Sequence, residues 1–279
     1  MRLHLASLSR LLLVTTFAIP ACSQSNSLTQ RQSVAREIPT HIREFSPALA
    51  APVMQVHRTT DSAGKLTGMH TENWGTAQLL PGGVMLSAGH VFPPELAPGT
   101  LPLLNLDGLM VQATILQRRD GGTIADWLLF QPVFDRGAFS PLDPPDSIQK
   151  RLANPLRVRI RFDADVFIPR GTTLYAFGFI HAPELESTES LPLTSAIIRG
   201  TTPRDLAPGD WIAFESDTPL SIKGMSGGPI ALYDEHTEEL VVVGVLTASH
   251  RRVSLWNSSP TRLIVGPRIP PEALIATQQ

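Results

Sequence analysis

Prolines and glycines divide this sequence into short segments, and that division constrains the fold more than any other feature. The 279 residues include 25 prolines and 20 glycines. The apolar runs between these residues are mostly no longer than a β-strand, a pattern typical of all-β proteins. Strand segments are predicted at 76–80, 84–87, 109–116, 128–130, 156–162, 174–180, 196–199, 211–214, 230–233 and 240–248.

A proline-rich stretch divides the strand pattern into two halves. Residues 132–155 contain five prolines and form the predicted junction between the halves. The second half opens at 156–162 with strict alternation of apolar residues and arginines, which predicts a strand with one buried and one solvated face. Residues 271–277 are predicted to form a short C-terminal helix.

The chain has one cysteine, Cys22, and a formal net charge of −2. A single cysteine excludes intrachain disulfides and thiol-based zinc clusters, so the apolar core must provide the stability. No basic stripe of the kind that binds nucleic acid is present, and we expect no nucleic-acid partner.

The N-terminus has the pattern of an export signal. Residues 1–21 begin with a positive charge at Arg2, and their apolar run at 11–19 is too short for a permanent membrane anchor. The segment Ile19-Pro20-Ala21-Cys22 resembles the bacterial lipobox, in which the cysteine is diacylated and becomes the mature N-terminus. Ordinary signal cleavage near Ala21, which would leave Cys22 as a free thiol, is the alternative.

Polar residues dominate the segment that follows. Residues 22–50 are rich in serine, glutamine, threonine and arginine, and they are predicted to form a flexible spacer. The folded domain is then expected at residues 51–279.

A serine in a glycine-rich turn is the strongest chemical signal. In Gly224-Met225-Ser226-Gly227-Gly228-Pro229, glycines allow the backbone to turn so that the N–H groups of Gly224 and Ser226 can face one oxygen. Two such donors are what an oxyanion hole requires. The motif predicts Ser226 as a nucleophile, which also needs a base to take its proton.

Two further segments provide a base and an acid. His90 ends Leu86-Ser87-Ala88-Gly89-His90, where small residues leave room for close packing behind a base. Asp126 opens the apolar segment 126–130, and its carboxylate can hold a histidine in the required tautomer. Asp120, which lies in a glycine turn, is the alternative acid.

The three candidates occur in the order His90, Asp126, Ser226, which is the chymotrypsin order. Over about residues 53–270 the chain resembles the bacterial trypsin-like serine proteases, closer to the high-temperature-requirement and glutamyl-endopeptidase kinds. The resemblance implies two perpendicular antiparallel β-barrels, a catalytic triad of these three residues, and peptide-bond hydrolysis through an acyl-enzyme. It also implies an oxyanion hole at Gly224 and Ser226, and neither cofactor nor metal.

The resemblance also indicates the substrate pocket. Its floor comes from the residue six before the nucleophile, which is Leu220, and its other predicted residues are Ser221, Ala248 and Ser249. An acidic floor would pair with lysine or arginine, so Leu220 argues against basic specificity. We expect a small or medium apolar substrate side chain.

These observations predict a monomeric serine endopeptidase that acts on proteins or peptides. It would be exported to the cell envelope, in the outer membrane or periplasm, and held to the membrane only by a lipid on Cys22, or else be secreted. The alternative is a catalytically inactive, trypsin-like binding module at the envelope. That alternative rests on Trp127 and Leu128, which are bulky where the family has small residues.

Overall fold

The computed structural model describes residues 38–100, 102–106, 109–122, 125–133, 150–151, 153–181, 193–216, 222–252 and 261–276. The export signal at 1–21, Cys22, the spacer up to residue 37 and most of the predicted junction lie outside these ranges. None of the helices within them is both long and apolar enough to cross a bilayer.

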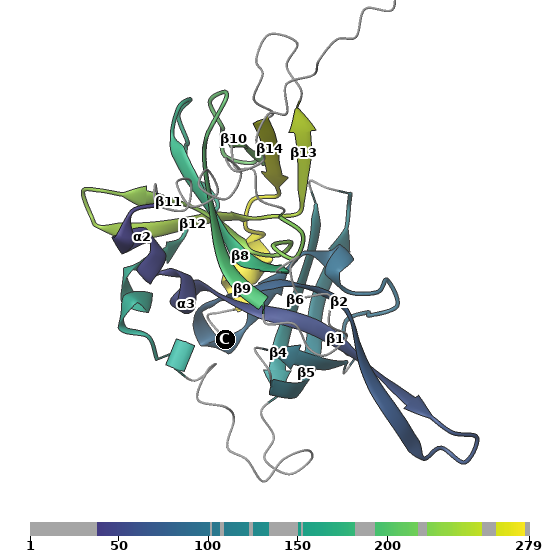
Figure 1. Ribbon diagram of the computed structural model, residues 1–279. Helices are drawn as coiled ribbons and strands as arrows, with labels where there is room; N and C mark the ends of the chain where they lie inside the picture. The colour runs from purple at the N-terminus through teal and green to yellow at the C-terminus, as the bar shows by residue number, and fades with distance from the viewer. Residues whose placement is uncertain are drawn as a thin grey trace, which may run out of the picture.

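The first half of the described chain is a closed antiparallel barrel with the strand order β1-β2-β3-β6-β5-β4 (Figure 1). The barrel closes because β1 pairs with β2 along one edge and with β4 along the other. Its strands are β1 (Ala50–Thr60), β2 (Leu66–Leu79), β3 (Met85–Ser87), β4 (Leu103–Leu106), β5 (Leu109–Asp120) and β6 (Asp126–Val133).

The second half is an eight-stranded sheet with the order β13-β14-β10-β9-β8-β11-β12-β7, followed by the helix α5. Its pairings are antiparallel except for the short parallel contact between β12 and β7. The elements are β7 (Ile160–Phe162), β8 (Thr173–His181), β9 (Leu193–Thr201), β10 (Ile212–Ser216), β11 (Pro229–Asp234), β12 (Glu239–Val245), β13 (Ala248–Arg252), β14 (Thr261–Gly266) and α5 (Pro271–Ala276).

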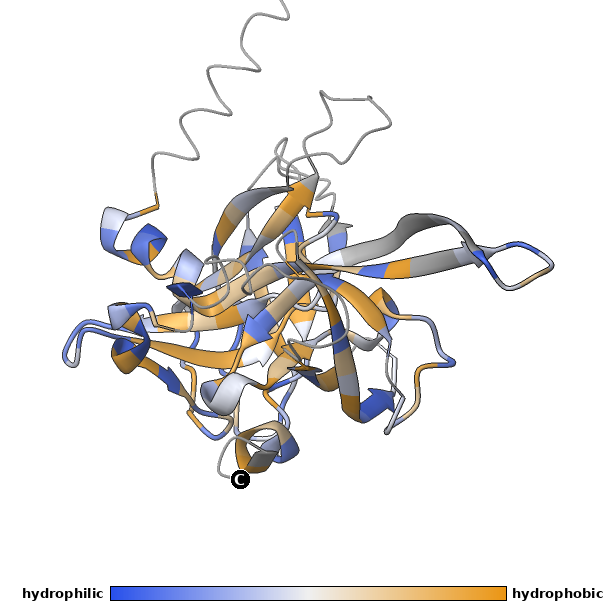
Figure 2. Ribbon diagram, turned by 90° about the horizontal axis from the view of Figure 1, so that it is seen from below, coloured by the Kyte–Doolittle hydropathy of each residue, from blue (hydrophilic) through white to orange (hydrophobic). Residues whose placement is uncertain are grey.

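The predicted fold class is therefore confirmed: the chain is mostly β, with two β units and a short C-terminal helix. Apolar residues run along the strands of both units, and polar residues occupy many of the turns (Figure 2). Within the described chain, Phe130 belongs to the core of the barrel and Phe214 to the core of the second unit. A third cluster joins residues of both units, among them Trp127 and Phe177.

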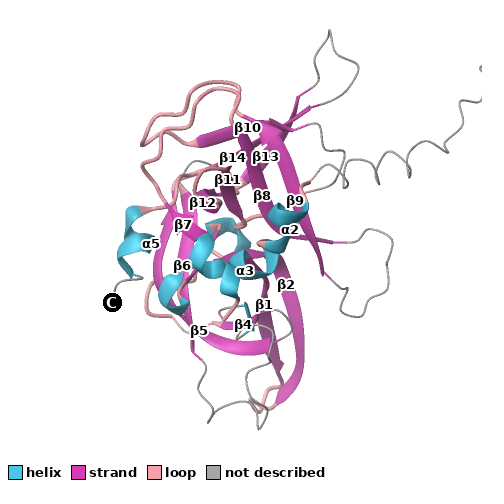
Figure 3. Cartoon of the chain, turned by 90° about the vertical axis from the view of Figure 1, so that its left-hand side faces the viewer, coloured by secondary structure: helices cyan, strands magenta, loops and turns pink. Residues whose placement is uncertain are grey.

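The segment just before β1 is part of the folded domain, although the sequence assigned it to the flexible spacer. It forms α2 (Thr40–Glu44) and α3 (Ser46–Leu49), which lie side by side on one face of the molecule (Figure 3). Ile42 and Phe45 are almost completely buried in the cluster shared by the two units. The domain thus begins by Ile38, because these apolar side chains supply part of its core.

The alternating segment 156–162 is not a single strand. Residues Pro155–Arg159 form a 3₁₀ helix, and only Ile160–Phe162 pair as β7. Proline suits the first turn of a helix, and the Asn154 side chain caps this one by accepting from the N–H of Leu156 at 2.9 Å. The capped 3₁₀ helix therefore forms where the alternation of apolar residues and arginines predicts the first part of a strand.

A buried arginine ties the loops of the second unit together. Arg268 is 8% exposed, and burial lowers the pKa of its guanidinium, while the charge of Asp210 opposes that shift. Charge-assisted hydrogen bonds of this kind are stronger than neutral ones. The guanidinium donates, at 3.0–3.3 Å, to the carbonyl oxygens of Asp210, Ala164, Val166, Leu206 and Ala207.

We predict that Arg268→Met lowers the free energy of unfolding by about 3 kcal/mol, because it leaves several carbonyl groups without their charged donor. Urea unfolding of the purified protein measures this loss. Arg170→Met is the matched control: Arg170 is exposed, and we expect a change within about 0.5 kcal/mol. Equal effects of the two substitutions would contradict the structural role of Arg268.

Candidate active site

Thr76, in β2, connects the barrel to the loop that carries the predicted nucleophile. Its backbone N–H donates to the carbonyl oxygen of Ser226 at 2.8 Å. Its hydroxyl donates to the carbonyl oxygen of Gly224 at 2.9 Å and accepts from the N–H of Phe179 at 3.0 Å. Thr76 is completely buried, so these hydrogen bonds hold the serine loop against the barrel without competition from water.

Two glycines allow the serine loop to take this path. Gly224 and Gly227 have φ values of 98° and 89°, a region that side chains rarely adopt. A Cβ atom at Gly227 would also overlap the carbonyl oxygen of Thr76 and the hydroxyl of Ser87. The N–H of Gly227 donates to the carbonyl oxygen of Leu246 at 2.7 Å, so both β units contact the loop at this residue.

The backbone of the loop leaves two N–H groups available. The N–H of Met225 donates to the carbonyl oxygen of Ile222 at 3.0 Å, and that of Gly227 is also hydrogen-bonded. In contrast, the N–H groups of Gly224 and Ser226 have no hydrogen-bond partner within the described chain. Unpaired donors in a well-packed loop are uncommon. They are the two donors that the sequence proposed for an oxyanion.

His90 and Asp126 meet where β3 ends and β6 begins. The register pairs Ser87 with Leu128, which brings the turn after β3 beside the first residue of β6. One oxygen of Asp126 accepts from the backbone N–H of His90 at 3.0 Å, and the other contacts Nδ1 of the same ring. A Cβ atom at Gly89 would overlap the Asp126 carboxylate, so this close approach requires glycine.

Burial differs between the two partners. The Asp126 side chain is 11% exposed, whereas the His90 side chain is 48% exposed. A largely buried carboxylate at Nδ1 favours the tautomer that carries its proton there. The second ring nitrogen, Nε2, is then free to accept a proton, as a general base must.

Asp120, the alternative acid, has a different partner. The Nε of Arg118 donates to both of its carboxylate oxygens, at 2.9 and 2.8 Å. Arg118 also donates to the carbonyl oxygens of Gly89 and Phe92, each at 3.4 Å, and so braces the turn that carries His90. Sequence reasoning missed Arg118, because its role depends on the pairing of β5 with the turn rather than on a motif.

Ser226 and the turn of His90 approach each other across Gly75. A Cβ atom at Gly75 would come within 2.9 Å of the Ser226 carbonyl oxygen and within 2.7 Å of the Val91 side chain. The serine loop therefore lies so close to Val91, the residue after His90, that no side chain at position 75 would fit between them. Within the described chain, no hydrogen bond joins the Ser226 hydroxyl to the His90 ring.

The two bulky residues after Asp126 pack into apolar cores on opposite faces of β6. Trp127 is 2% exposed and packs in the cluster shared by the two units, whereas Leu128 is fully buried in the barrel. Successive side chains of a strand point to opposite faces. The large residues therefore fill core volume on both sides and leave the carboxylate beside His90.

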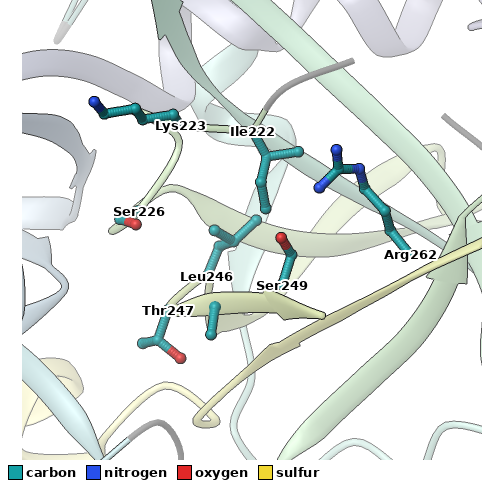
Figure 4. A pocket seen from close by; sticks show the side chains of 8 residues that line it. Ile222, Lys223, Ser226, Leu246, Thr247, Ser249 and Arg262 are labelled. Carbon is teal, nitrogen blue, oxygen red and sulfur yellow. The ribbon is translucent and has the colours of Figure 1, made fainter. Parts of the chain in front are cut away.

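A pocket of about 360 Å³ opens beside Ser226 (Figure 4). Ala248 and Ser249, which the sequence assigned to a substrate pocket, are among its lining residues. Leu220 and Ser221 lie outside the described residues. The lining residues are Ile222, Lys223, Ser226, Leu246, Thr247, Ala248, Ser249 and Arg262.

Arg262 was not selected from the sequence. It lies in β14 two residues before Ile264, which is fully buried. Residues two apart share one face of a strand, so Arg262 lies on the same face of β14 as Ile264. No strand is predicted from the sequence at residues 261–266, where the structure has β14.

No protein-family model matches this sequence. No curated protein matches it either. Among solved structures, the chain is similar to the Rv3671c protease from M. tuberculosis in its active form, with 14% identity, coverage of 93% of this chain and 89% of that one, and a TM-score of 0.40. An inactive serine-to-alanine mutant of Rv3671c gives 12% identity, coverage of 94% and 96%, and a TM-score of 0.38. Similarity at this level leaves the function to be argued from the site.

We predict that Thr76→Val lowers the free energy of unfolding by about 2–4 kcal/mol, because two buried backbone groups lose their hydroxyl partner. Thr76→Ser is the matched control: it keeps the hydroxyl, loses one methyl group and should cost about 1 kcal/mol. Urea unfolding measures both. If valine were tolerated as well as serine, the hydroxyl would not be what holds the loop.

Proposed function

We propose that this protein is a trypsin-like serine endopeptidase. The observation that carries the proposal is the combination of Asp126 at Nδ1 of His90 with two unpaired N–H groups around Ser226. Acyl transfer needs an oriented base and preorganised oxyanion donors, and the two arrangements supply one each.

The proposed reaction begins when the Ser226 hydroxyl attacks the carbonyl carbon of the peptide bond and its proton passes to Nε2 of His90. The N–H groups of Gly224 and Ser226 stabilise the resulting oxyanion. His90 then gives the proton to the leaving nitrogen, and the carbon–nitrogen bond breaks to leave an acyl-enzyme.

Water completes the proposed cycle. It loses a proton to His90, attacks the acyl carbon and releases the acid, and the proton returns to Ser226. Throughout the cycle Asp126 stays ionised and keeps His90 oriented. The free ring nitrogen lies on a half-exposed side chain, which gives both substrate and water access to it.

We also propose that the enzyme works outside the cytoplasm, attached by a lipid on Cys22. The supporting pattern is the positive, then apolar, N-terminal segment that ends at Ile19-Pro20-Ala21-Cys22. The substrate would then be a protein or peptide within reach of the cell envelope.

We expect a fluorophosphonate to label the purified wild-type protein, because the reagent is attacked by an activated serine. Ser226→Ala should abolish labelling, and Asp126→Asn should slow it by about 10³- to 10⁴-fold through the wrong tautomer of His90. Fluorescence of the labelled band on a gel, followed over time, measures the rate.

Asp120→Asn is the control for the acid, since Asp120 pairs with Arg118 rather than with His90. This substitution should slow the labelling by less than about tenfold. Absence of labelling in well-folded wild-type protein would favour the inactive binding module instead.

We further expect the wild-type protein to incorporate radioactive palmitate when cells produce it, because diacylation of Cys22 adds fatty acids. Cys22→Ala should remove the label and move the protein from the membrane fraction to the soluble exported fraction. Ser226→Ala should keep the label, which separates anchoring from activity. Wild-type protein that is exported without label would support ordinary signal cleavage.

A further inference from the structure

The described lining of the pocket beside Ser226 includes positively charged side chains and no carboxylate. Lys223 and Arg262 are among its lining residues, and no acidic residue is found among those that the structure describes there. Ile222 and Leu246 provide apolar walls, which lower the local dielectric and strengthen electrostatic interactions within the pocket. A negatively charged group is therefore the favoured occupant.

The two positive side chains differ in direction. Figure 4 shows Arg262 and Ser249 directed into the same space beside Ile222, whereas Lys223 extends away from that space. Ser226 lies on the opposite side of the labelled group from Arg262. The reacting hydroxyl and the guanidinium thus lie at two sides of one pocket.

The Arg262 side chain is also unpaired among the residues that the structure describes. The backbone of Arg262 pairs with β10 and β13, but its guanidinium has no hydrogen bond or ion pair with any part of the chain that the structure describes. Other arginines with little exposure do have acceptors: for example, Arg118 bonds to Asp120 and to carbonyl groups, and the buried Arg268 bonds to five carbonyl groups. A guanidinium has five donors in a planar fork, which matches a carboxylate.

We propose that this pocket binds an acidic side chain, glutamate or aspartate, at the residue that precedes the cleaved bond, with its carboxylate paired to Arg262. This specificity rests on the proposed endopeptidase function. It replaces the apolar side chain expected from Leu220, because Arg262 supplies a positive charge in the pocket. The Ser249 hydroxyl, beside the guanidinium, adds a second donor.

The first experiment compares peptide substrates that differ only at the residue before the cleaved bond. Wild-type full-length protein should cleave after glutamate or aspartate with a kcat/KM about 100-fold higher than after glutamine or asparagine, which have the same shapes without charge. Arg262→Gln should bring this ratio of kcat/KM values close to one. Arg262→Lys should still cleave acidic substrates faster than amide substrates, but by a smaller ratio, because lysine keeps the charge and lacks the planar fork of donors.

Arg170→Gln is the matched control, because Arg170 is exposed, lies outside the pocket and carries the same charge. This substitution should leave the ratio of kcat/KM for acidic to amide substrates unchanged. Thermal unfolding of each variant establishes that it is folded. A wild-type preference for leucine or lysine, or an unchanged ratio in folded Arg262→Gln, would overturn the proposal.

The second experiment tests the pocket without catalysis. Calorimetry measures binding of peptides that end in glutamate amide or glutamine amide to the Ser226→Ala variant. The glutamate peptide should bind at least about tenfold more tightly, and adding Arg262→Gln should remove the difference. Equal binding of the two peptides would refute the acidic pocket.

The two experiments separate this proposal from the proposed function. Charge-dependent binding without any cleavage by wild-type protein would contradict the endopeptidase function and support the acidic pocket. A third peptide, ending in leucine with a free carboxylate, distinguishes the sources of the negative charge. If it bound through Arg262 as tightly as the glutamate amide, the guanidinium would recognise chain ends rather than side chains.

Discussion

The buried hydrogen bonds of Thr76 are the contacts on which the rest of the site depends. One residue of the barrel holds the carbonyl groups of Gly224 and Ser226 and the N–H of Phe179 in the second unit. In a water-free interior these bonds are costly to break. They determine where the serine loop lies relative to β3, and β3 leads directly to His90. The two units are thus aligned at the point where the proposed chemistry occurs.

Local sequence signals predicted the parts of the site that depend on local geometry. The glycines around Ser226 are required by positive φ angles and by close backbone approach, and such requirements are visible in a motif. Asp126 was identifiable because it begins an apolar strand. The fold class followed from segment length and turn residues, which reflect strand pairing throughout the chain.

Other features could not be predicted, because they depend on pairings between distant segments. The brace from Arg118 to the carbonyl of Gly89 forms only when β5 lies beside the turn of His90. Arg262 gains its role from the pocket that β13 and β14 help to form. Residues 156–162 show the reverse case, in which a capped 3₁₀ turn prevailed over an alternation that indicated a strand.

The burial of α2 and α3 also sets the length of any tether. Because the folded domain begins by Ile38, roughly 16 residues separate it from Cys22, and a fully extended chain of that length reaches about 55 Å. A spacer up to residue 50 would reach about 100 Å. A lipid on Cys22 would therefore confine the proposed protease to a thin layer next to the membrane, where it would meet membrane-proximal chains far more often than freely diffusing ones.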